Sequence, residues 1–281
     1  MNHGFNLADA VRKRYSVRTY EKRTLDESVR QDLLAYAERL QNPFGPKIRV
    51  QYIERKSAAN GEKLGTYGVI RGTDSFLGVT VKDGEFALEA LGYDFEQLVL
   101  YAASIGLGTC WLGGTFNRSA FAAAMEIEEG ELFPILSPIG YPADNKSLIE
   151  RIMRGTTGAD KRQDWSKLFF CGSFENPITQ QQSCEYAFPL EMLRLAPSAV
   201  NVQPWRVVLK EDCVHFLKKH SAAPLGGMDM QRIDLGIAIC HFHLAVQEMG
   251  IEGGFEYIEP DFAVPSDLKY VITWKRKTPE A

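Results

Sequence analysis

The pattern of apolar positions predicts a helix, two strands and a second helix in the first part of the chain. Apolar residues recur at helical spacing after Thr24 and Glu27, whose own spacing is that of a capping box, so we expect Thr24 to cap this helix. Apolar and polar residues alternate at 48–53, and an apolar run follows at 76–81, as expected for strands. A long apolar pattern at 86–105, closed by a glycine, predicts the second helix.

The same order of elements is predicted again further along the chain. A helix ends at 196–198, where Ala-Pro-Ser interrupts its pattern, and strands are predicted at 205–209 and 214–217. A long helix follows at 234–250, again closed by a glycine, and a last strand is predicted at 270–274. The chain therefore predicts one series of elements twice.

The residues themselves repeat as well. Leu91-Gly92 recurs as Leu235-Gly236, and the end of the same helix recurs at the same spacing along the chain. The block around Asn42 recurs around Asn201 at a longer spacing, which predicts a longer connection within the first half. A period this long is not that of a solenoid. We interpret the chain as an internal duplication of one α+β unit, with a chance similarity of two helix–strand passages as the alternative.

The composition is that of a folded globular protein. The 281 residues are 45% hydrophobic and 24% charged, and at about 150 residues per domain this length fits two domains or one large one. The net charge of −4 argues against a nucleic-acid-binding protein. No apolar run reaches the roughly 18 residues that span a bilayer, and the N-terminus shows no signal core. The five cysteines have no CxxC spacing, so we expect reduced thiols and a cytoplasmic protein.

Several chemistries are not indicated. The sequence contains no GxxxxGK[ST], HExxH or GxSxG motif. The glycine-rich stretch 106–114 has Trp where a dinucleotide fingerprint has its third glycine, and it follows a helix instead of opening one. His241 and His243 are two residues apart on a predicted helix and point to different faces, so we expect one packed and one exposed histidine and no metal site.

A dense basic cluster lies at 12–20. Three arginines and one lysine fall within seven residues, and Ser16 and two tyrosines lie among them. Guanidinium forks and hydroxyls are the groups that bind a phosphate monoester. The alternative is a solvated basic helix end.

A second cluster lies in the predicted loop at 196–206. Pro197, Ser198 and Asn201 precede a strand, and loops are where binding groups concentrate. The alternative is an ordinary loop rich in turn-forming residues.

Taken together, these clusters resemble the flavin-dependent nitroreductase superfamily. Arg14-Tyr-Ser16-Val-Arg18 is similar to that family's N-terminal Arg-x-Ser-x-[Arg/Lys] element, and residues 196–205 resemble its second signature almost residue for residue. The stretch 106–114 resembles the third element, and Pro-Ile-Gly-Tyr-Pro at 138–142 resembles the strand and turn that follow. The resemblance covers most of the chain.

The order of these elements departs from the usual family pattern. The second signature should follow soon after the basic element, but residues 40–46 stand there instead, and the second repeat carries 175–182 in place of a basic element. The chain thus resembles the tandem nitroreductase subgroup, in which one chain mimics the family homodimer. This implies a nitroreductase-like α+β fold with halves at 1–170 and 171–281, packed as one globule, and one FMN per chain.

The resemblance also implies which residues contact FMN. Arg14 and Ser16 match contacts to the phosphate and ribityl chain, and Arg18 matches a basic residue near the pyrimidine edge, where its charge would stabilise the anionic reduced ring. Lys161 and Arg162 match a late basic pair that closes on the phosphate. The backbone stretch near the flavin N5 consists of Leu112, Gly113 and Gly114. The contacts from the opposite unit are Pro197, Ser198 and Asn201.

The activity implied is that of an FMN-dependent oxidoreductase. NAD(P)H delivers hydride to the flavin, which reduces a nitroaromatic, quinone or similar small acceptor in a ping-pong cycle, and no protein nucleophile is required. The alternatives are a non-catalytic flavin- or ligand-binding descendant and a specialised flavin reaction such as dehalogenation or dehydrogenation. We expect a monomer that acts as a pseudo-dimer, with a homodimer as the alternative.

Three further residues are weaker candidates. Cys110 lies beside the glycine stretch, where a packed small residue is favoured over a redox role. Tyr67 and Arg71 are candidates for the substrate side, with a plain glycine-rich loop as the favoured alternative.

Overall fold

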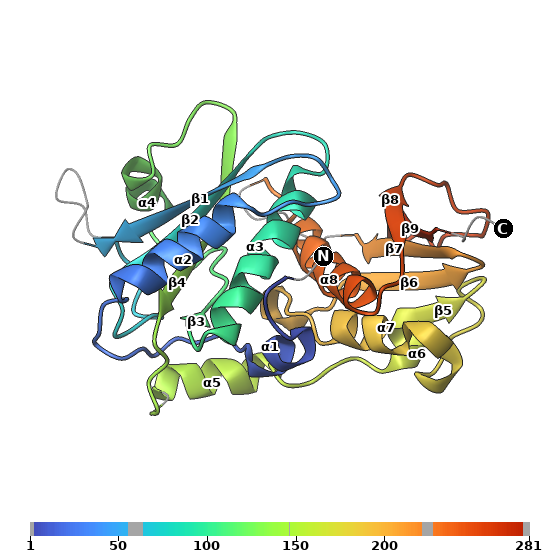
Figure 1. Ribbon diagram of the computed structural model, residues 1–281, viewed down its shortest axis with the longest axis horizontal. Helices are drawn as coiled ribbons and strands as arrows, with labels where there is room; N and C mark the ends of the chain where they lie inside the picture. Colours follow the sequence, from blue (N-terminus) through green and yellow to red (C-terminus); the bar gives the residue numbers. More distant parts are fainter. Residues whose placement is uncertain (1–2, 56–63, 146, 221–226, 278–281) are drawn as a thin grey trace. The chain divides into compact units, whose positions relative to one another are not determined.

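The computed structural model describes residues 3–55, 64–145, 147–220 and 227–277. The chain divides into two compact units, Gly4–Asp160 and Lys161–Ala281 with the N-terminal Met1–His3. Each unit is an α+β structure built around its own sheet (Figure 1). The domain limits of 1–170 and 171–281 expected from the sequence remain a prediction.

The first unit contains a four-stranded antiparallel sheet. Its strand order is β1-β2-β4-β3, and neighbouring strands run in opposite directions. Its elements in chain order are α1 (Leu7–Lys13), α2 (Glu27–Glu38), β1 (Ile48–Glu54), β2 (Ser75–Lys82), α3 (Ala87–Ser104), β3 (Gly108–Thr109), α4 (Arg118–Ala124), β4 (Glu131–Gly140) and α5 (Leu148–Thr157).

Both faces of this sheet are covered. Residues 75–81 of β2 are buried without alternation, although successive side chains of a strand point to opposite faces. On one face Phe76 meets Phe121 of α4, with the ring centroids 5.0 Å apart. On that same face Gly78 leaves room for Met125, whose Sδ would lie 2.1 Å from an added Cβ. The long helix α3 packs against β1 and β2 and also contacts α1 and α2 (Figure 1).

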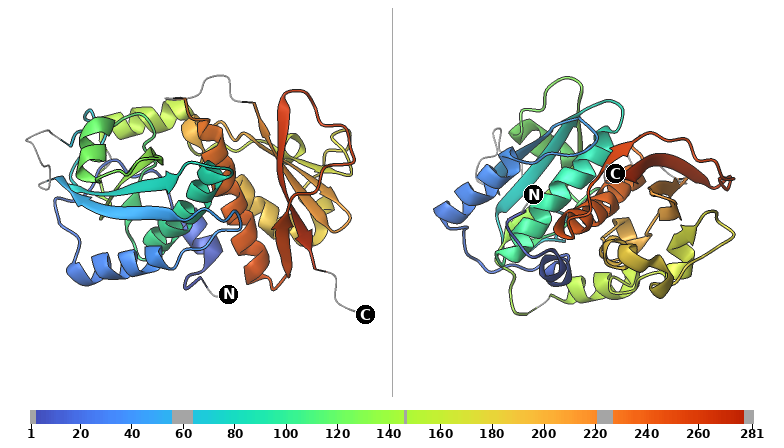
Figure 2. Two further views of the ribbon diagram at one scale, coloured as in Figure 1. Left: turned by 90° about the horizontal axis from the view of Figure 1, so that it is seen from above. Right: turned by 45° about the vertical axis from the view of Figure 1, so that its right-hand side comes forward.

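The second unit contains a five-stranded sheet of order β5-β6-β7-β9-β8. All its neighbours are antiparallel except β5, which runs parallel to β6. Helices α7 and α8 pack against each other, and α8 lies against β6 and β7 (Figure 2, where α8 is orange). The elements are α6 (Trp165–Leu168), β5 (Phe169–Cys171), η3 (Gln181–Tyr186), α7 (Ala187–Arg194), η4 (Ala199–Asn201), β6 (Trp205–Lys210), β7 (Cys213–Lys219), α8 (Met230–Glu248), β8 (Gly253–Glu256) and β9 (Leu268–Arg276).

The two units repeat one fold. The order β1-β2-β4-β3 recurs as β6-β7-β9-β8, and in each unit the long helix connects the second of these strands to the third in chain order. The ends of these helices also match. Gly106 and Gly250 have φ of +83° and +71°, and the residue after each donates its backbone N–H five residues back, over 2.8 and 2.9 Å. The predicted duplication and both glycine C-caps are confirmed, as is the longer first-half connection, which lies between β1 and β2.

The capping box predicted at Thr24 is wrong. Helix α2 begins at Glu27, and its N-cap is Asp26, which makes no side-chain capping bond. The carboxylate of Asp26 instead accepts from Arg23 at 2.7 Å and from the Tyr141 hydroxyl at 3.0 Å. Glu27 turns toward Arg30, 2.6 Å away, so it does not reach back along the chain. Ion pairs with nearby arginines replace the reciprocal cap.

The other predicted helices and strands are present, with small shifts at their ends. Helix α8 begins earlier than predicted because the carboxylate of Asp229 caps it by accepting the N–H of Gln231 at 3.1 Å. None of the described helices is both long and apolar enough to cross a membrane.

Candidate functional site

Residues 14–20 of the predicted basic cluster, here called the basic segment, are extended and lie beside β3. Helix α1 ends at Lys13, Ser16 then pairs in parallel with Thr109, and the Val17 N–H donates to the Thr109 carbonyl at 2.9 Å. Gly108 permits this approach, because an added Cβ would lie 2.7 Å from a Val17 methyl group. An extended backbone sends alternate side chains to opposite sides, so the predicted residues Arg14, Ser16 and Arg18 share one side.

Arg14 pairs with a buried carboxylate. Its Nε lies 3.9 Å from Oε1 of Glu96 on α3, and the two side chains are 9% and 0% exposed. Oε2 of Glu96 accepts the indole N–H of Trp111 at 3.1 Å. Glu96 therefore links Arg14, the predicted phosphate residue, to Trp111, which lies between β3 and the turn at residues 112–114, here called the glycine turn. No pattern in the sequence indicated this connection.

Arg18 is held by a second carboxylate. Glu150 of α5 is 1% exposed. Its Oε2 accepts hydrogen bonds from the backbone N–H of Arg18 at 3.3 Å and from the Thr19 hydroxyl at 3.0 Å. The Arg18 guanidinium donates to the Ser16 carbonyl at 3.4 Å. The backbone of Arg71 pairs with this segment, since its N–H donates to the Arg18 carbonyl at 3.0 Å. No sequence signal connected Glu150 to a residue so far away along the chain.

Cys110 lies in the core beside this segment. Its thiol is buried, and burial raises its pKa, against the smaller opposing effects of Arg18 and Ser16. A thiol with a raised pKa is a poor nucleophile. This environment favours the interpretation of Cys110 as a packed small residue.

The predicted stretch near the flavin N5 forms a turn fixed by Arg118. Leu112 is buried and exchanges backbone hydrogen bonds of 2.9 and 3.0 Å with Leu136 of β4. The Gly113 carbonyl accepts from the Arg118 guanidinium at 2.6 Å, and Arg118 also donates to the Phe133 carbonyl. Burial lowers the pKa of Arg118. Nothing in the sequence marks Arg118 for this role except its position at the start of α4.

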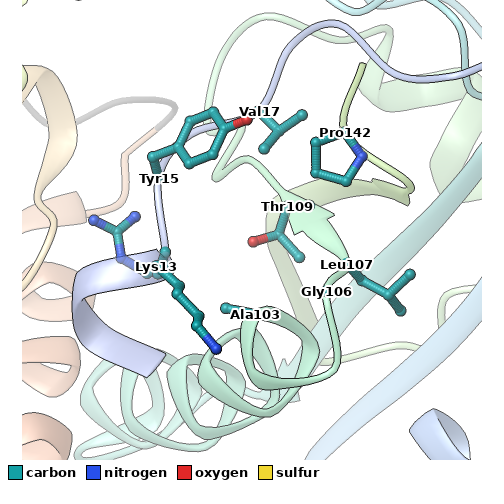
Figure 3. Close-up of a pocket in the computed structure, with 10 residues that line it drawn as sticks. Lys13, Tyr15, Val17, Ala103, Gly106, Leu107, Thr109 and Pro142 are labelled. Carbon is teal, nitrogen blue, oxygen red and sulfur yellow. The ribbon is translucent and has the colours of Figure 1, made fainter. Parts of the chain in front are cut away.

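A pocket of about 200 Å³ opens on this unit (Figure 3). Lys13, Tyr15 and Thr109 contribute polar groups around it, and Arg14 also lines it. Ser16 and Arg18 are not among the described residues of its lining. The remaining lining residues are Val17, Ala103, Gly106, Leu107, Gly108 and Pro142. The pocket therefore lies along the basic segment and shares only Arg14 with the predicted flavin contacts.

In the second unit, residues 198–203 form a strained loop, here called the signature loop. Val200, Asn201 and Gln203 have positive φ angles of 44°, 59° and 52°. Such angles are uncommon for residues other than glycine and least expected for the β-branched Val200. The Ser198 hydroxyl accepts the Gln203 N–H at 2.9 Å, which closes the loop. Pro197 precedes the loop and is half-buried.

The signature loop also holds the segment of Lys161 and Arg162. The Asn201 amide donates to the Lys161 carbonyl at 2.9 Å, and Gln203 Oε1 accepts the Gln163 N–H at 2.9 Å. Arg162 donates to the Leu195 carbonyl at 3.1 Å. The structure thus brings the late basic pair and the second signature together within one unit.

A buried aspartate connects the signature loop to α8. Oδ1 of Asp234 accepts the Ala199 N–H at 2.9 Å, and burial raises the pKa of Asp234 to about 7. The first unit has a similar arrangement, in which the Asn42 amide donates to Oδ2 of Asp94 at 2.7 Å. Burial raises the pKa of Asp94 to about 7 as well. Neither aspartate was singled out from the sequence.

The two histidines of α8 differ from the prediction in one respect. His241 is fully buried, with Nδ1 2.9 Å from the Met192 carbonyl oxygen. His243 is not exposed but half-buried, and burial lowers its pKa to about 4. The prediction of an exposed histidine is therefore wrong, because strand β8 places Phe255 against the ring of His243, with the ring centroids 5.0 Å apart. Across the described residues, no group of three or more His, Cys, Asp and Glu could hold a metal ion.

Comparison with known proteins places these features in context. A crystal structure of a putative nitroreductase from Thermotoga maritima matches with 21% identity and a TM-score of 0.60, over 98% of this chain and 95% of that one. A nitroreductase with bound FMN from Bacteroides fragilis matches at 13% identity and a TM-score of 0.42, over 51% of this chain and 91% of that one. A nitroreductase family protein from Clostridium novyi matches at 19% identity and a TM-score of 0.40, over 50% and 86%. No curated protein matches the chain.

The duplicated α+β architecture is the nitroreductase fold, which the full-length match to the Thermotoga maritima structure supports. The family model described as "Putative TM nitroreductase" matches residues 6–246, which include the basic segment, the glycine turn and the signature loop. The chain belongs to this nitroreductase family.

Proposed function

We propose that the protein is an FMN-dependent oxidoreductase that takes hydride from NAD(P)H and reduces a small planar acceptor such as a quinone or nitroaromatic. The observation that carries the proposal is the pairing of the basic segment with β3, which leads into the glycine turn. In a chain of the nitroreductase family, this pairing supports Arg14, Ser16 and Arg18 as the residues that hold the phosphate and pyrimidine ends of FMN.

The residues of the first unit fit this cofactor. Arg14 and Ser16 supply a guanidinium and a hydroxyl, the groups that bind a phosphate monoester, and Arg18 supplies the cation that we assign to the pyrimidine edge. The buried Glu96 pairs with the Arg14 guanidinium, and the buried Glu150 accepts the backbone N–H of Arg18. Both contacts orient these residues before a ligand binds. Bound FMN would supply the hydride-accepting ring, so the protein needs no nucleophile of its own.

The glycine turn is the part of the chain that we assign to the reactive edge of the flavin. The Arg118 guanidinium donates a hydrogen bond to the Gly113 carbonyl, which fixes the orientation of the turn. Small residues at Gly113 and Gly114 allow the backbone to approach a planar ring closely. The resemblance also assigns Lys161, Arg162, Pro197, Ser198 and Asn201 to FMN, and that assignment remains a prediction which substitutions can test.

We further propose a cytoplasmic protein. All five cysteines are free thiols in the structure, and two of them, Cys171 and Cys184, are exposed. Exposed thiols persist in a reducing compartment.

The test is purification followed by a flavin spectrum, a stoichiometry measurement and a turnover assay. We expect one FMN per chain and oxidation of NADH or NADPH with a quinone or nitroaromatic acceptor. Arg14→Ala should weaken FMN binding, and Lys47→Ala, a change of an exposed cation outside these segments, should not. Absence of FMN binding with excess cofactor would refute the proposal, and bound FMN without turnover would indicate a binding protein.

A further inference from the structure

The signature loop has a conformation that its own residues do not favour. Three of its non-glycine residues have positive φ, and each residue in such a region costs of the order of a few kT unless its surroundings hold it. Several contacts that hold the loop come from nearby segments of chain, among them those of the Ser198 hydroxyl, the Lys161 carbonyl and the Gln163 N–H. Another comes from the long helix α8, through Asp234.

Asp234 is a buried carboxylate with one bonded oxygen. The residue is 4% exposed, and Oδ1 accepts the Ala199 N–H at 2.9 Å. Its Oδ2 is buried and has no hydrogen-bond partner among the described residues. A buried ionised carboxylate without full hydrogen bonding is costly, and a neutral one is much less so.

The charges near Asp234 do not compensate an ionised carboxylate. Asp229, the N-cap of α8, acts on it with a like charge and is itself paired with Lys218 of β7 at 2.6 Å. On α7 and β6, which pack against α8, the charged groups named here have partners of their own. Arg194 pairs with Glu191 on α7, Arg206 donates to the Gln203 carbonyl, and Lys210 pairs with Asp261. The imidazoles are likewise engaged: Nδ1 of His241 is 2.9 Å from the Met192 carbonyl and Nδ1 of His215 is 2.7 Å from the Thr273 hydroxyl.

We propose that Asp234 is a positioning residue for the signature loop, which it holds closed while it is protonated and releases toward water when it ionises. Any effect of this loop motion on FMN binding rests on the proposed function, but the loop motion itself does not.

The direction follows from proton linkage. Burial raises the pKa of Asp234 from its ordinary value of 3.8 to about 7, so the closed loop keeps a proton that a hydrated carboxylate would release. Opening that brings Asp234 into water is therefore favoured about tenfold more for each pH unit between about 4 and about 7, where the hydrated carboxylate is ionised and the buried one is not. Above about pH 7 the carboxylate is ionised in both states, so a further rise in pH adds nothing to opening.

The first unit offers a matched control. Asp94 of α3 is also buried with its pKa raised to about 7, but it accepts from the Asn42 amide and does not contact the signature loop. Asp94→Asn and Asp234→Asn remove the same charge from the same kind of environment and keep an oxygen acceptor at the site. They differ in the loop to which the replaced carboxylate is hydrogen-bonded, at Asn42 for Asp94 and at Ala199 for Asp234.

The experiment is amide hydrogen exchange at Ala199 in the full chain without added FMN, from about pH 4 to about pH 9, corrected for the intrinsic exchange rate at each pH. In the wild type we expect protection to fall up to about tenfold per unit between about pH 4 and about pH 7 and then to level off. Asp234→Asn should give a flat profile, and Asp94→Asn should keep the wild-type profile at Ala199. A wild-type profile that is flat, or an Asp234→Asn profile with the wild-type slope, would overturn the proposal.

A second readout separates this inference from the proposed function. The dissociation constant of FMN is measured over the same pH range for the three proteins. A pH-dependent affinity that Asp234→Asn abolishes supports both. If FMN does not bind at any pH while Ala199 shows the expected profile, the proposed function fails and the positioning role of Asp234 stands.

Discussion

We predict that the substitution Gly108→Ala, which adds one methyl group, displaces the whole basic segment. An added Cβ would lie 2.7, 2.9 and 3.0 Å from the three heavy atoms of the Val17 side chain, against an ordinary contact of about 3.5–4.0 Å. Val17 is 2% exposed, and its branched side chain is stiff at χ1, so it cannot turn away. The backbone of the segment must therefore retreat by roughly an ångström.

The cost of Gly108→Ala follows from this geometry. Overpacking a well-packed core costs about 1–3 kcal/mol, and a clash with a stiff, buried side chain belongs in the upper part of that range. Gly108 does not have a positive φ, so backbone strain adds nothing to the effect. We expect the free energy of unfolding to fall by about 2–3 kcal/mol, and FMN affinity to fall at least about tenfold because Arg14, Ser16 and Arg18 move together.

The assay is urea unfolding followed by circular dichroism, with FMN titration in parallel. Gly84→Ala is the matched control, because Gly84 lies outside the positive φ region and an added Cβ would meet nothing within 4 Å. Its free energy of unfolding should stay within about 0.5 kcal/mol of the wild type. Val17→Ala should rescue Gly108→Ala, with a coupling energy of about 1–2 kcal/mol. A Gly108→Ala protein as stable as the control, or a double mutant whose effects simply add, would refute the reasoning.

Three further predictions concern the buried charges. Glu96→Gln should lower the free energy of unfolding by about 3 kcal/mol, because it leaves the Arg14 guanidinium without its buried carboxylate, and thermal unfolding with and without FMN measures this. Arg118→Met should destabilise by about 1–3 kcal/mol through the orphaned Gly113 carbonyl, and Arg118→Lys should recover part of that loss. For Asp94, the folded pKa of about 7 exceeds the ordinary value of 3.8, so its stabilising contribution is complete below about pH 3.8 and is lost progressively as pH rises to about 7. Asp94→Asn should remove about 1.4 kcal/mol per pH unit of that decline, measured by urea unfolding at a series of pH values, and an unchanged pH slope would contradict it.

The sequence predicted features whose causes are local in the chain. Gly106 and Gly250 were recognised as helix ends because a left-handed residue is needed after the last turn, and both adopt it. The internal repeat was recognisable because the same local signals recur in the same order. The false cap at Thr24 shows the limit of such reasoning, since the spacing was correct but Asp26 and Glu27 bind arginines instead.

The contacts that shape the candidate site depend on tertiary structure and could not be read from the chain. Glu150 reaches Arg18 from a helix 132 positions away, and Glu96 reaches Arg14 through the packing of α3 on α1. A carboxylate on a helix has the same local pattern whether it faces solvent or an arginine. His243 shows the same limit, because its half-burial depends on Phe255, which belongs to another element.

The two aspartates suggest why each half of the duplicated fold ties its loop to its long helix. With Gly92 matched to Gly236, Asp234 corresponds to Ala90, and Asp94 corresponds to Ala238. Positions 90 and 94 are four residues apart, about one helical turn, so both carboxylates lie on the same face of the repeated helix. The two tethers are therefore not copies of one ancestral residue. In each unit a buried carboxylate on this face accepts a hydrogen bond from a loop donor, the side-chain amide of Asn42 or the backbone N–H of Ala199.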